Sequence, residues 1–316
     1  MANRNDNNKK GVWASLLGEA TPAKASGLTF SLSALFSVAL SFIFLLIVAM
    51  SGATKGYETQ DWYLYASFLI SPVTFALVAW YIFRWSKTSV KSEIKAQICP
   101  ARYFLIAIVL QCGLFCLSQL NTIFLDWLTN FGYEDIPINL PSMDGFGFVG
   151  TLIAVALLPA VFEELIFRGL LLKGMRSFGT VGAVFLNGAL FALYHQNPAQ
   201  TLYQFCCGVA FALMAIRAGS ILPTVLSHFI NNALILTLTK YNLDTFSPTV
   251  TTVVLIVSAL CFAVSLAWLL FVDRKNSYPS QKDKKTATDR KEFFVCASVG
   301  IIFCLLTWFI TLASGL

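Results

Sequence analysis

The chain has 316 residues, of which 57% are hydrophobic and only 12% are charged. This is far more apolar than a soluble globular protein, so the composition excludes an ordinary soluble domain and predicts an all-α, polytopic transmembrane helix bundle. The net charge of +6 is expected to come from basic cytoplasmic loops that contact anionic lipid, and we expect no binding to nucleic acid.

A helix needs about 20 mostly apolar residues to cross the hydrocarbon core of a membrane. Nine stretches of about that size occur along the chain. The fifth and sixth are short and are joined by little more than QNPAQ, so a count of eight spans with one re-entrant piece stays open. The nine predicted spans are residues 28–52, 63–83, 103–125, 148–172, 180–197, 202–218, 220–239, 250–272 and 293–313.

Positively charged loops stay on the cytoplasmic side of a membrane. If all nine spans cross, the basic segments fall on one side, and the connection 126–147, which has no Lys or Arg, falls on the other. The sequence therefore predicts a multi-pass protein of the cell membrane, which we expect to be bacterial, with a cytoplasmic N-terminus and an external C-terminus. The basic groups are Arg4, Lys9, Lys10 and Lys24; Arg84, Lys87, Lys91, Lys95 and Arg102; Lys173 and Arg176; Arg217; and residues 273–291.

The simplest division of the chain is a cytoplasmic N-terminal segment, 1–27, followed by one multi-span membrane domain, 28–316. Within the membrane domain, the basic stretch 273–291 is expected to be a flexible cytoplasmic loop. The eight cysteines show neither a disulfide framework nor a CxxC metal knuckle, and they are interpreted as small residues of the helix interior.

Ionisable residues are rare at membrane depth because their burial is costly, and they mark functional sites. Of the 16 acidic residues, only Glu163 and Glu164 lie well within a predicted span. The only two histidines, His195 and His228, also lie within predicted spans. This coincidence is the strongest functional signal of the sequence.

Residues four apart on a helix share a face, whereas neighbours point about 100° apart. In EELIFR, residues 163–168, Glu164 and Arg168 are therefore expected to form an ion pair, which leaves Glu163 as a free carboxylate. In FALYH, residues 191–195, Phe191 can shield the site from water while His195 points inward.

In HFINN, residues 228–232, His228 and Asn232 share a face, so that two donors can converge as an oxyanion hole. A carboxylate and a neutral imidazole can together deprotonate a water molecule. No serine or cysteine has an evident base beside it, which argues against a covalent intermediate. These groups predict hydrolysis of a peptide bond by an activated water.

The three segments resemble the motifs EExxxR, FxxxH and HxxxN of the CPBP family of intramembrane proteases, which includes type II CAAX prenyl endopeptidases and bacteriocin-processing proteins. The resemblance covers roughly residues 148–240, the expected catalytic core. It implies three pairs of roles: water activation by Glu163 with His195, support of the site by Glu164 with Arg168, and an oxyanion hole formed by His228 with Asn232.

The favoured mechanism needs no cofactor. The alternative is a divalent metal ion such as zinc, held by Glu163, His195 and His228 with a water in an open fourth position. One feature is difficult for either mechanism. At about 1.5 Å per residue, Glu163 and His228 lie in the cytoplasmic halves of their helices, but His195 lies nearer the outer end of its own. Tilted or broken helices, or different helix boundaries, would bring His195 back to the other two residues.

Two other functions compete with an intramembrane endopeptidase. A non-proteolytic scaffold or bacteriocin-immunity protein of the same family would regulate a membrane partner, but the presence of every motif residue favours the enzyme. An ion-coupled transporter would use the Glu and His residues as a proton relay, but no inverted repeat is apparent. The expected partners are the lipid bilayer and a peptide or membrane-protein substrate.

Overall fold

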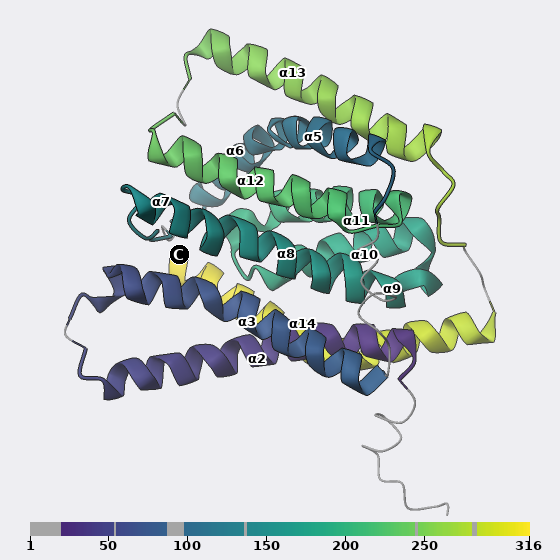
Figure 1. Cartoon of the computed structure of the whole chain (residues 1–316), viewed down its shortest axis with the longest axis horizontal. Helices are drawn as coiled ribbons and strands as arrows, with labels where there is room; N and C mark the ends of the chain where they lie inside the picture. The colour runs from purple at the N-terminus through teal and green to yellow at the C-terminus, as the bar shows by residue number, and fades with distance from the viewer. Residues whose placement is uncertain (1–19, 54, 87–97, 136–137, 244–245, 280–282) are drawn as a thin grey trace, which may run out of the picture.

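The computed structural model describes residues 20–53, 55–86, 98–135, 138–243, 246–279 and 283–316. Within these ranges the regular structure is entirely helical (Figure 1), and eight stretches are long and apolar enough to cross a membrane. The predicted class, a polytopic transmembrane helix bundle, is confirmed. The eight stretches are Pro22–Met50, Asp61–Ser86, Arg102–Thr129, Phe146–Tyr194, Pro198–Ala218, Leu222–Lys240, Pro248–Val272 and Lys284–Gly315.

Several helices begin at capping residues that the sequence provides. The side chain of Thr21 accepts a hydrogen bond from the Lys24 N–H at the start of α2 (Pro22–Met50), and Ser247 caps α13 (Pro248–Ala267) in the same way. Both helices have proline in the first turn, where its missing N–H costs nothing. The other α-helices are α3 (Asp61–Ser86), α5 (Arg102–Leu114), α6 (Cys116–Thr129), α7 (Phe146–Thr151), α8 (Leu158–Glu164), α9 (Leu172–Gly174), α10 (Gly179–Tyr194), α11 (Thr201–Ala218), α12 (Leu222–Lys240) and α14 (Lys284–Gly315).

The stretch Phe146–Tyr194 contains two of the nine predicted spans. Its first arm runs from α7 to α9, and the 3₁₀ turn η4 (Met175–Phe178) reverses the chain into α10. The Asn187 side-chain amide donates to the Phe167 carbonyl at 2.8 Å, so the second arm packs back along the first. The eight apolar stretches therefore accommodate the predicted spans 148–172 and 180–197 as the two arms of one helical hairpin.

The helices form three layers (Figure 1). On one flank α2 packs against α14 and α3, and on the other flank α13 packs against α5. Between them lie the hairpin of α7 to α10 and the helices α11 and α12, with α10 packed along α11. Large apolar side chains cover the outside of the flanks, including Phe42, Ile256 and Ile310, as is expected of helices that face lipid. The polar motifs lie on the enclosed central layer.

Two glycines allow α10 and α11 to approach closely. A Cβ atom at Gly208 would lie 2.8 Å from the Gly188 Cα, and a Cβ atom at Gly188 would lie 2.9 Å from the Val209 backbone nitrogen. Small residues are used in this way in membrane bundles, because apolar side chains gain little by leaving lipid and close backbone packing supplies the attraction. Gly188 and Gly208 therefore serve helix packing at this crossing.

The basic stretch 273–291 differs from its predicted flexibility. Residues 284–291 form the first turns of α14, which begins after Asp283 because this carboxylate accepts a hydrogen bond from the Thr286 N–H. The same bond lowers the pKa of Asp283. Upstream, the side chain of Asn276 donates to the Arg217 carbonyl, and the Arg290 guanidinium donates to the Ser177 carbonyl. The charge pattern predicted a flexible loop in solvent. Instead, the cap at Asp283 and the hydrogen bonds of Asn276 and Arg290 hold the described residues of this stretch in place.

Most of the described basic residues of the orientation prediction lie at one end of the bundle. Lys24, Arg84, Lys173, Arg217 and Lys284 lie at the end where α2 begins, whereas the connection between α6 and α7, which has no Lys or Arg, lies at the other end, near the C-terminus (Figure 1). Lys55 and Lys240 lie at this second end, so the separation is not complete, and the orientation stays a prediction. Six further basic positions of that prediction, Arg4, Lys9, Lys10, Lys87, Lys91 and Lys95, lie outside the described residues.

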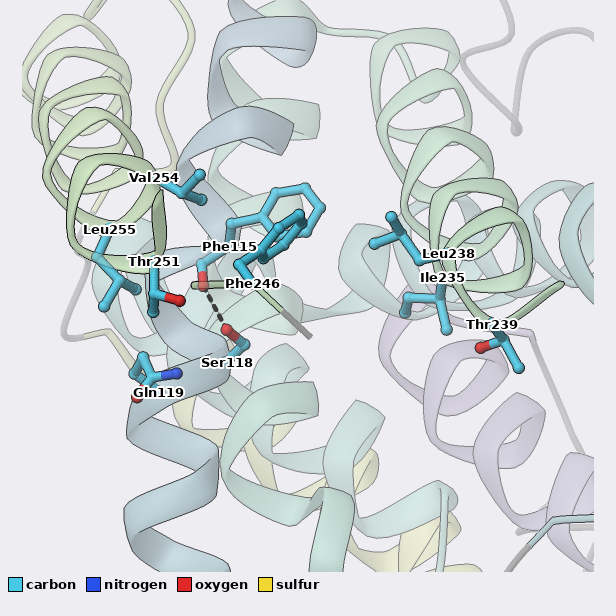
Figure 2. A pocket seen from close by; sticks show the side chains of 10 residues that line it. All are labelled: Phe115, Ser118, Gln119, Ile235, Leu238, Thr239, Phe246, Thr251, Val254 and Leu255. Atoms are coloured by element: carbon cyan, nitrogen blue, oxygen red, sulfur yellow. Dashed lines mark hydrogen bonds between the residues drawn. The ribbon is translucent and has the colours of Figure 1, made fainter. Parts of the chain in front are cut away.

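A cavity of about 300 Å³ separates the end of α12 from α13 and α6 (Figure 2). No ionisable side chain lines it, and it does not include any of the six motif residues. Its walls include Phe115, Gln119, Ile235, Leu238, Phe246 and Leu255. Of these residues, Ile235 also lines the neighbouring cavity beside Asn232, whereas Gln119 does not.

The orientation predicts opposite accessibility of the two termini. An epitope tag placed before Met1 should bind antibody only after the membrane is permeabilised, and a tag placed after Leu316 should bind antibody on intact cells or spheroplasts. Immunofluorescence of both tagged forms, with a cytoplasmic marker as control, measures this. Equal accessibility of the two tags would contradict the odd number of crossings.

The close approach of α10 and α11 predicts that Gly208→Val destabilises the bundle. The added side chain would meet the Gly188 backbone and Phe191, so the helices must separate and the free energy of unfolding in detergent should fall by about 1–3 kcal/mol. Gly182→Ala is the matched control, because its new Cβ would meet only the Phe178 side chain, at 3.2 Å. An unchanged thermal midpoint for Gly208→Val would contradict the packing described.

Candidate active site

The arm from α7 to α9 carries two π-helical turns that flank the paired glutamates. The turn η2 (Leu152–Leu157) precedes α8, and the turn η3 (Leu165–Leu171) follows it, so that Glu163 and Glu164 end α8 directly before a π-turn. Such turns widen the helix and lower the rise per residue, and they often occur at functional sites. The local backbone thus departs from a regular helix where the ionisable groups lie.

Glu164 and Arg168 form the predicted ion pair in full burial. The Arg168 Nη1 atom lies 2.9 Å from the Glu164 Oε1 atom, and neither side chain is exposed. The guanidinium carbon lies 4.3 Å from the centre of the Phe191 ring and 5.5 Å from the centre of the Phe211 ring. The Nη2 atom also approaches the Gly208 carbonyl, at 3.4 Å. Charge, aromatic faces and a carbonyl dipole together replace the water that the arginine has lost.

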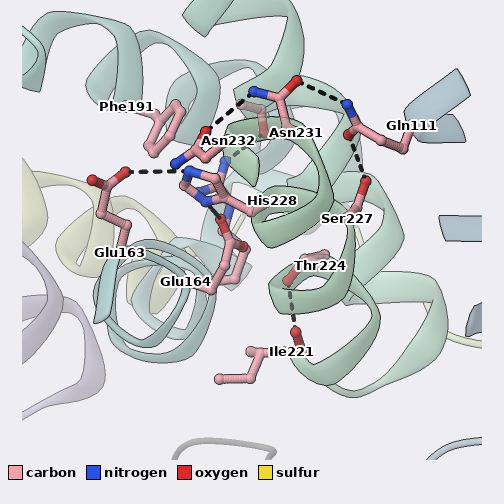
Figure 3. Close-up of polar contacts among 12 residues, drawn as sticks. Gln111, Glu163, Glu164, Phe191, Ile221, Thr224, Ser227, His228, Asn231 and Asn232 are labelled. Atoms are coloured by element: carbon pink, nitrogen blue, oxygen red, sulfur yellow. Dashed lines mark hydrogen bonds and ion pairs between the residues drawn. The ribbon is translucent and has the colours of Figure 1, made fainter. Parts of the chain in front are cut away.

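His228 lies between the two glutamates (Figure 3). Its Nδ1 atom is 3.0 Å from the Glu164 Oε1 atom, and its Nε2 atom is 3.9 Å from the Glu163 Oε2 atom. The first contact is a hydrogen bond and fixes the plane of the ring. The second is longer and directs the free ring nitrogen toward Glu163. The ion pair of Glu164 therefore extends to the histidine of α12.

Glu163 differs from its neighbour in its surroundings. Its side chain is 14% exposed, and its Oε2 atom is buried without a hydrogen-bond partner among the described residues. Buried carboxylate oxygens ordinarily have a partner, which is often an ordered water molecule. This is the free carboxylate that the helix-face argument expected on this arm.

His195 follows the last residue of α10, and the packing of this helix bears on its expected depth. The α10 helix has 16 residues and extends only about 24 Å. Its second half packs beside η3, because the Phe191 and Phe167 rings are 5.0 Å apart. The end of α10 therefore lies near the arm that carries Glu163. The pairing of His195 with Glu163 stays a prediction.

The His195 ring is held by its own helix. Its Nδ1 atom lies 2.8 Å from the Phe191 carbonyl oxygen, so this nitrogen carries the proton and Nε2 is the free acceptor. The Phe191 ring is 4.7 Å from the His195 ring and 6.1 Å from the His228 ring. Phe191, which is 1% exposed, thus separates both histidines from the exterior, as its position in FALYH predicts.

A chain of side-chain amides orients Asn232. The Asn231 Nδ2 atom donates to the Asn232 Oδ1 atom at 3.3 Å, and the Asn231 Oδ1 atom accepts from Gln111 and from the Tyr203 hydroxyl, each at 2.8 Å. Because the Asn232 oxygen is an acceptor here, its Nδ2 atom faces the other way, toward the Val155 carbonyl at 3.4 Å. Asn231 therefore faces away from His228, toward α5 and α11, and positions its neighbour (Figure 3).

Sequence reasoning missed the two distant members of this chain, Gln111 on α5 and Tyr203 on α11. A signal was present for Gln111, which is a lone amide within an apolar span and is 2% exposed. Polar side chains in such places commonly bond to a neighbouring helix. Which helix Gln111 meets, however, depends on the packing of α5 against α12.

The alternative metal site stays a prediction. A search of the described ranges finds no group of three His, Cys, Asp or Glu side chains placed to hold a metal ion. Of the three predicted ligands, His228 is bonded to Glu164 through Nδ1, and His195 is bonded to the Phe191 carbonyl through Nδ1, while the Glu163 Oε2 atom lies 3.9 Å from the His228 Nε2 atom. The reaction proposed below uses these side chains without a metal ion.

The comparisons with known proteins agree with this arrangement. Residues 145–234 match the model of the family described as type II CAAX prenyl endopeptidase Rce1-like. These residues form an Rce1-like domain. The matched segment contains Glu163, Glu164, Arg168 and His195, as well as His228 and Asn232. No curated relative and no solved structure matches the chain.

The Rce1-like domain confirms the resemblance drawn from the three motifs and supports a peptidase. It begins at the start of α7 and ends within α12, so it corresponds to the hairpin and the two helices that follow it. The flanking helices α2 to α6, α13 and α14 lie outside the matched segment. The match thus coincides with the layer that holds the polar centre.

The buried ion pair predicts strong and unequal effects of substitution. Arg168→Met would leave the Glu164 carboxylate without a counter-charge, so the free energy of unfolding in detergent should fall by about 3–5 kcal/mol. Replacing both residues, as Glu164→Met with Arg168→Met, removes both desolvation costs and should lose less stability than Arg168→Met alone. The free energy of unfolding in mild detergent is measured for the wild type, for Arg168→Met and for the double variant. A single variant as stable as the wild type would contradict the described pairing.

Proposed function

We propose that the protein is an intramembrane endopeptidase that hydrolyses a peptide bond with a water molecule activated by Glu163 and His195. The observation that carries the proposal is the buried Oε2 atom of Glu163, which has no hydrogen-bond partner among the described residues and lies 3.9 Å from the His228 Nε2 atom. The buried Phe191 ring contacts both His228 and His195. A carboxylate oxygen in this position lacks a hydrogen-bond donor, and a water molecule can donate to it. The Rce1-like domain supports the peptidase class.

In the proposed reaction, the water donates one hydrogen bond to Glu163 and another to the Nε2 atom of His195. Glu163 removes a proton from the water as its oxygen forms a bond to the carbonyl carbon of the substrate. The carbonyl becomes an oxyanion. When this tetrahedral intermediate collapses, the carbon–nitrogen bond breaks, and Glu163 passes its proton to the departing amine. The carboxylate is then ready for the next cycle.

The oxyanion is proposed to bind between His228 and Asn232. His228 donates from Nε2 when both of its ring nitrogens are protonated, because Nδ1 is already engaged with Glu164. Asn232 donates from Nδ2, which makes only a long bond of 3.4 Å to the Val155 carbonyl and can exchange this partner for the substrate. Two donors of this kind stabilise a developing charge by several kcal/mol in a water-poor site. Glu164 and Arg168 act on the reaction by holding His228.

The expected setting is the cytoplasmic membrane of a bacterium, with the N-terminus inside the cell. The expected substrate is a peptide or a membrane protein. Two classes follow from the resemblance: a prenylated CAAX peptide and a bacteriocin-type leader peptide. A non-catalytic scaffold that binds a membrane partner remains the competing function, and it would not require the Glu163 carboxylate.

The test is the cleavage of both substrate classes by purified protein in detergent. Glu163→Gln should lower kcat by about 10²–10⁴-fold, because the amide cannot accept the proton from water. The protein should remain folded, because the Oε2 atom of Glu163 makes no hydrogen bond with the described residues. Glu134→Gln is the matched control, since this glutamate is exposed at the end of the bundle and should keep wild-type activity.

Wild-type cleavage by Glu163→Gln would refute the proposed role of this residue. If the wild type cleaved no member of either class while a membrane partner bound equally to wild type and Glu163→Gln, the scaffold would be favoured. Cleavage assays and partner capture with the same two proteins therefore separate the enzyme from the scaffold.

A further inference from the structure

A second cavity lies directly beside Asn232. It has a volume of about 410 Å³, is partly open, and is lined by residues of α3, α6, α11, α12, the π-turn η2 and the segment 138–140. Both Asn232 and Val155, whose carbonyl bonds to Asn232, belong to its wall. Its volume is within the range of pockets that bind small ligands or side chains. We refer to it below as the Asn232 cavity.

The wall of the Asn232 cavity is largely apolar and carries no charge. It includes the amides of Asn121, Gln200 and Gln204 as well as apolar groups such as Phe68 and Leu236. The Asn121 Oδ1 atom is buried without a hydrogen-bond partner among the described residues. A buried acceptor of this kind is costly unless something in the cavity donates to it. The occupant must therefore offer hydrogen-bond donors as well as apolar surface.

An occupant with a formal charge would not fit this wall. A charged side chain would lose its water and would meet only neutral amides and hydrocarbon, which costs several kcal/mol when no counter-charge is present. Gln200 and Gln204 are four residues apart at the start of α11, so they form one continuous amide face. A substrate residue with a neutral side chain fits this wall, because the side chain can pack on the apolar groups and its peptide N–H can donate to an amide oxygen.

The Asn232 cavity is also next to the proposed reaction centre. A substrate whose scissile carbonyl accepts from Asn232 must extend away from it, and an extended chain advances about 3.3 Å per residue. The cavity wall begins at Asn232 itself, so the occupant belongs to the residue next to the scissile bond or to the one beyond it.

We propose that the Asn232 cavity is the subsite that receives a neutral side chain of the substrate beside the scissile bond, and that Gln204 determines the preference for a neutral group. This inference rests on the proposed endopeptidase function and adds the chemistry of the accepted side chain. Gln204 is a specificity residue in this assignment and takes no part in the chemical step.

The decisive experiment changes the charge of the wall in the full-length protein. Gln204→Glu places a carboxylate in the Asn232 cavity, where it would pair with a substrate lysine. A peptide that the wild type cleaves is varied at each of three positions on both sides of the scissile bond to Leu, Gln, Glu and Lys. The wild type should disfavour Glu and Lys at one position near the bond. At that same position, Gln204→Glu should raise kcat/KM for Lys relative to Leu by about tenfold or more.

The matched control is Gln119→Glu, which makes the same change on the wall of the cavity between α12 and α13. It should leave the preference at every position as in the wild type. If Gln204→Glu does not fold, Gln200→Glu, one turn away on the same face, replaces it. A general loss of stability lowers kcat/KM for all peptides together and cannot invert a preference at one position.

The outcomes separate this inference from the proposed function. Cleavage by the wild type together with an unchanged preference in the folded cavity variant would overturn the subsite and leave the endopeptidase standing. Equal effects of Gln204→Glu and Gln119→Glu would also overturn it. Absence of cleavage by the wild type, with every peptide of both classes, would contradict the endopeptidase itself and the subsite with it.

Discussion

The polar centre of this bundle depends on the desolvation of one arginine. Removing a guanidinium from water is costly, and Arg168 is compensated by a carboxylate, the carbonyl of Gly208 and the faces of Phe191 and Phe211. These groups come from α8, α10 and α11. Because His228 of α12 bonds to the same carboxylate, the charge of Arg168 ties four helices together. The close crossing of α10 and α11 at Gly188 and Gly208 brings the carbonyl and the rings within reach.

The burial of Arg168 gives the two adjacent glutamates different surroundings. Neighbouring residues of a helix point about 100° apart, so only one of the two can face Arg168. Glu164 has a cation and a histidine as partners and is fully buried. Glu163 keeps one oxygen without a partner, next to the free nitrogen of His228. The carboxylate with two partners is thus separated by a single step along the chain from the carboxylate proposed to react, and both lie near the His228 ring.

Much of this arrangement could be predicted from the sequence because it follows from short-range geometry. The spacing of Glu164 and Arg168 is a property of any helix, and the long apolar stretches limit the chain to a membrane bundle. The depth of His195 could not be obtained in this way, because it depends on the length of α10 and on the π-turn that follows Glu164. The structure of residues 273–279 and 283–291 was missed for a related reason, because the strong charge of this stretch concealed the cap at Asp283 and the contact of Arg290 with the hairpin turn.

Contacts between helices that are distant in the chain could not be predicted from the sequence. The partners of Asn231 are Gln111 on α5 and Tyr203 on α11, and only the packed bundle brings them together. Because these partners donate to the Asn231 oxygen, its nitrogen donates to the Asn232 oxygen and leaves the Asn232 nitrogen directed toward the Val155 carbonyl. The proposed oxyanion site and the amide chain are therefore parts of one arrangement.

The same distinction separates the chemistry of the site from its selectivity. The Rce1-like domain, residues 145–234, contains all six motif residues and so contains the whole of the proposed reactive centre. Much of the wall of the Asn232 cavity lies outside it, on α3, α6, the segment before α7 and the second half of α12: Phe68, Asn121, Ile138, Leu140 and Leu236. The matched domain can therefore support a class of reaction without specifying the substrate. In the proposed subsite, the flanking helices supply much of the surface that a substrate side chain would meet, and their neutral amides and hydrocarbon would determine which side chains enter.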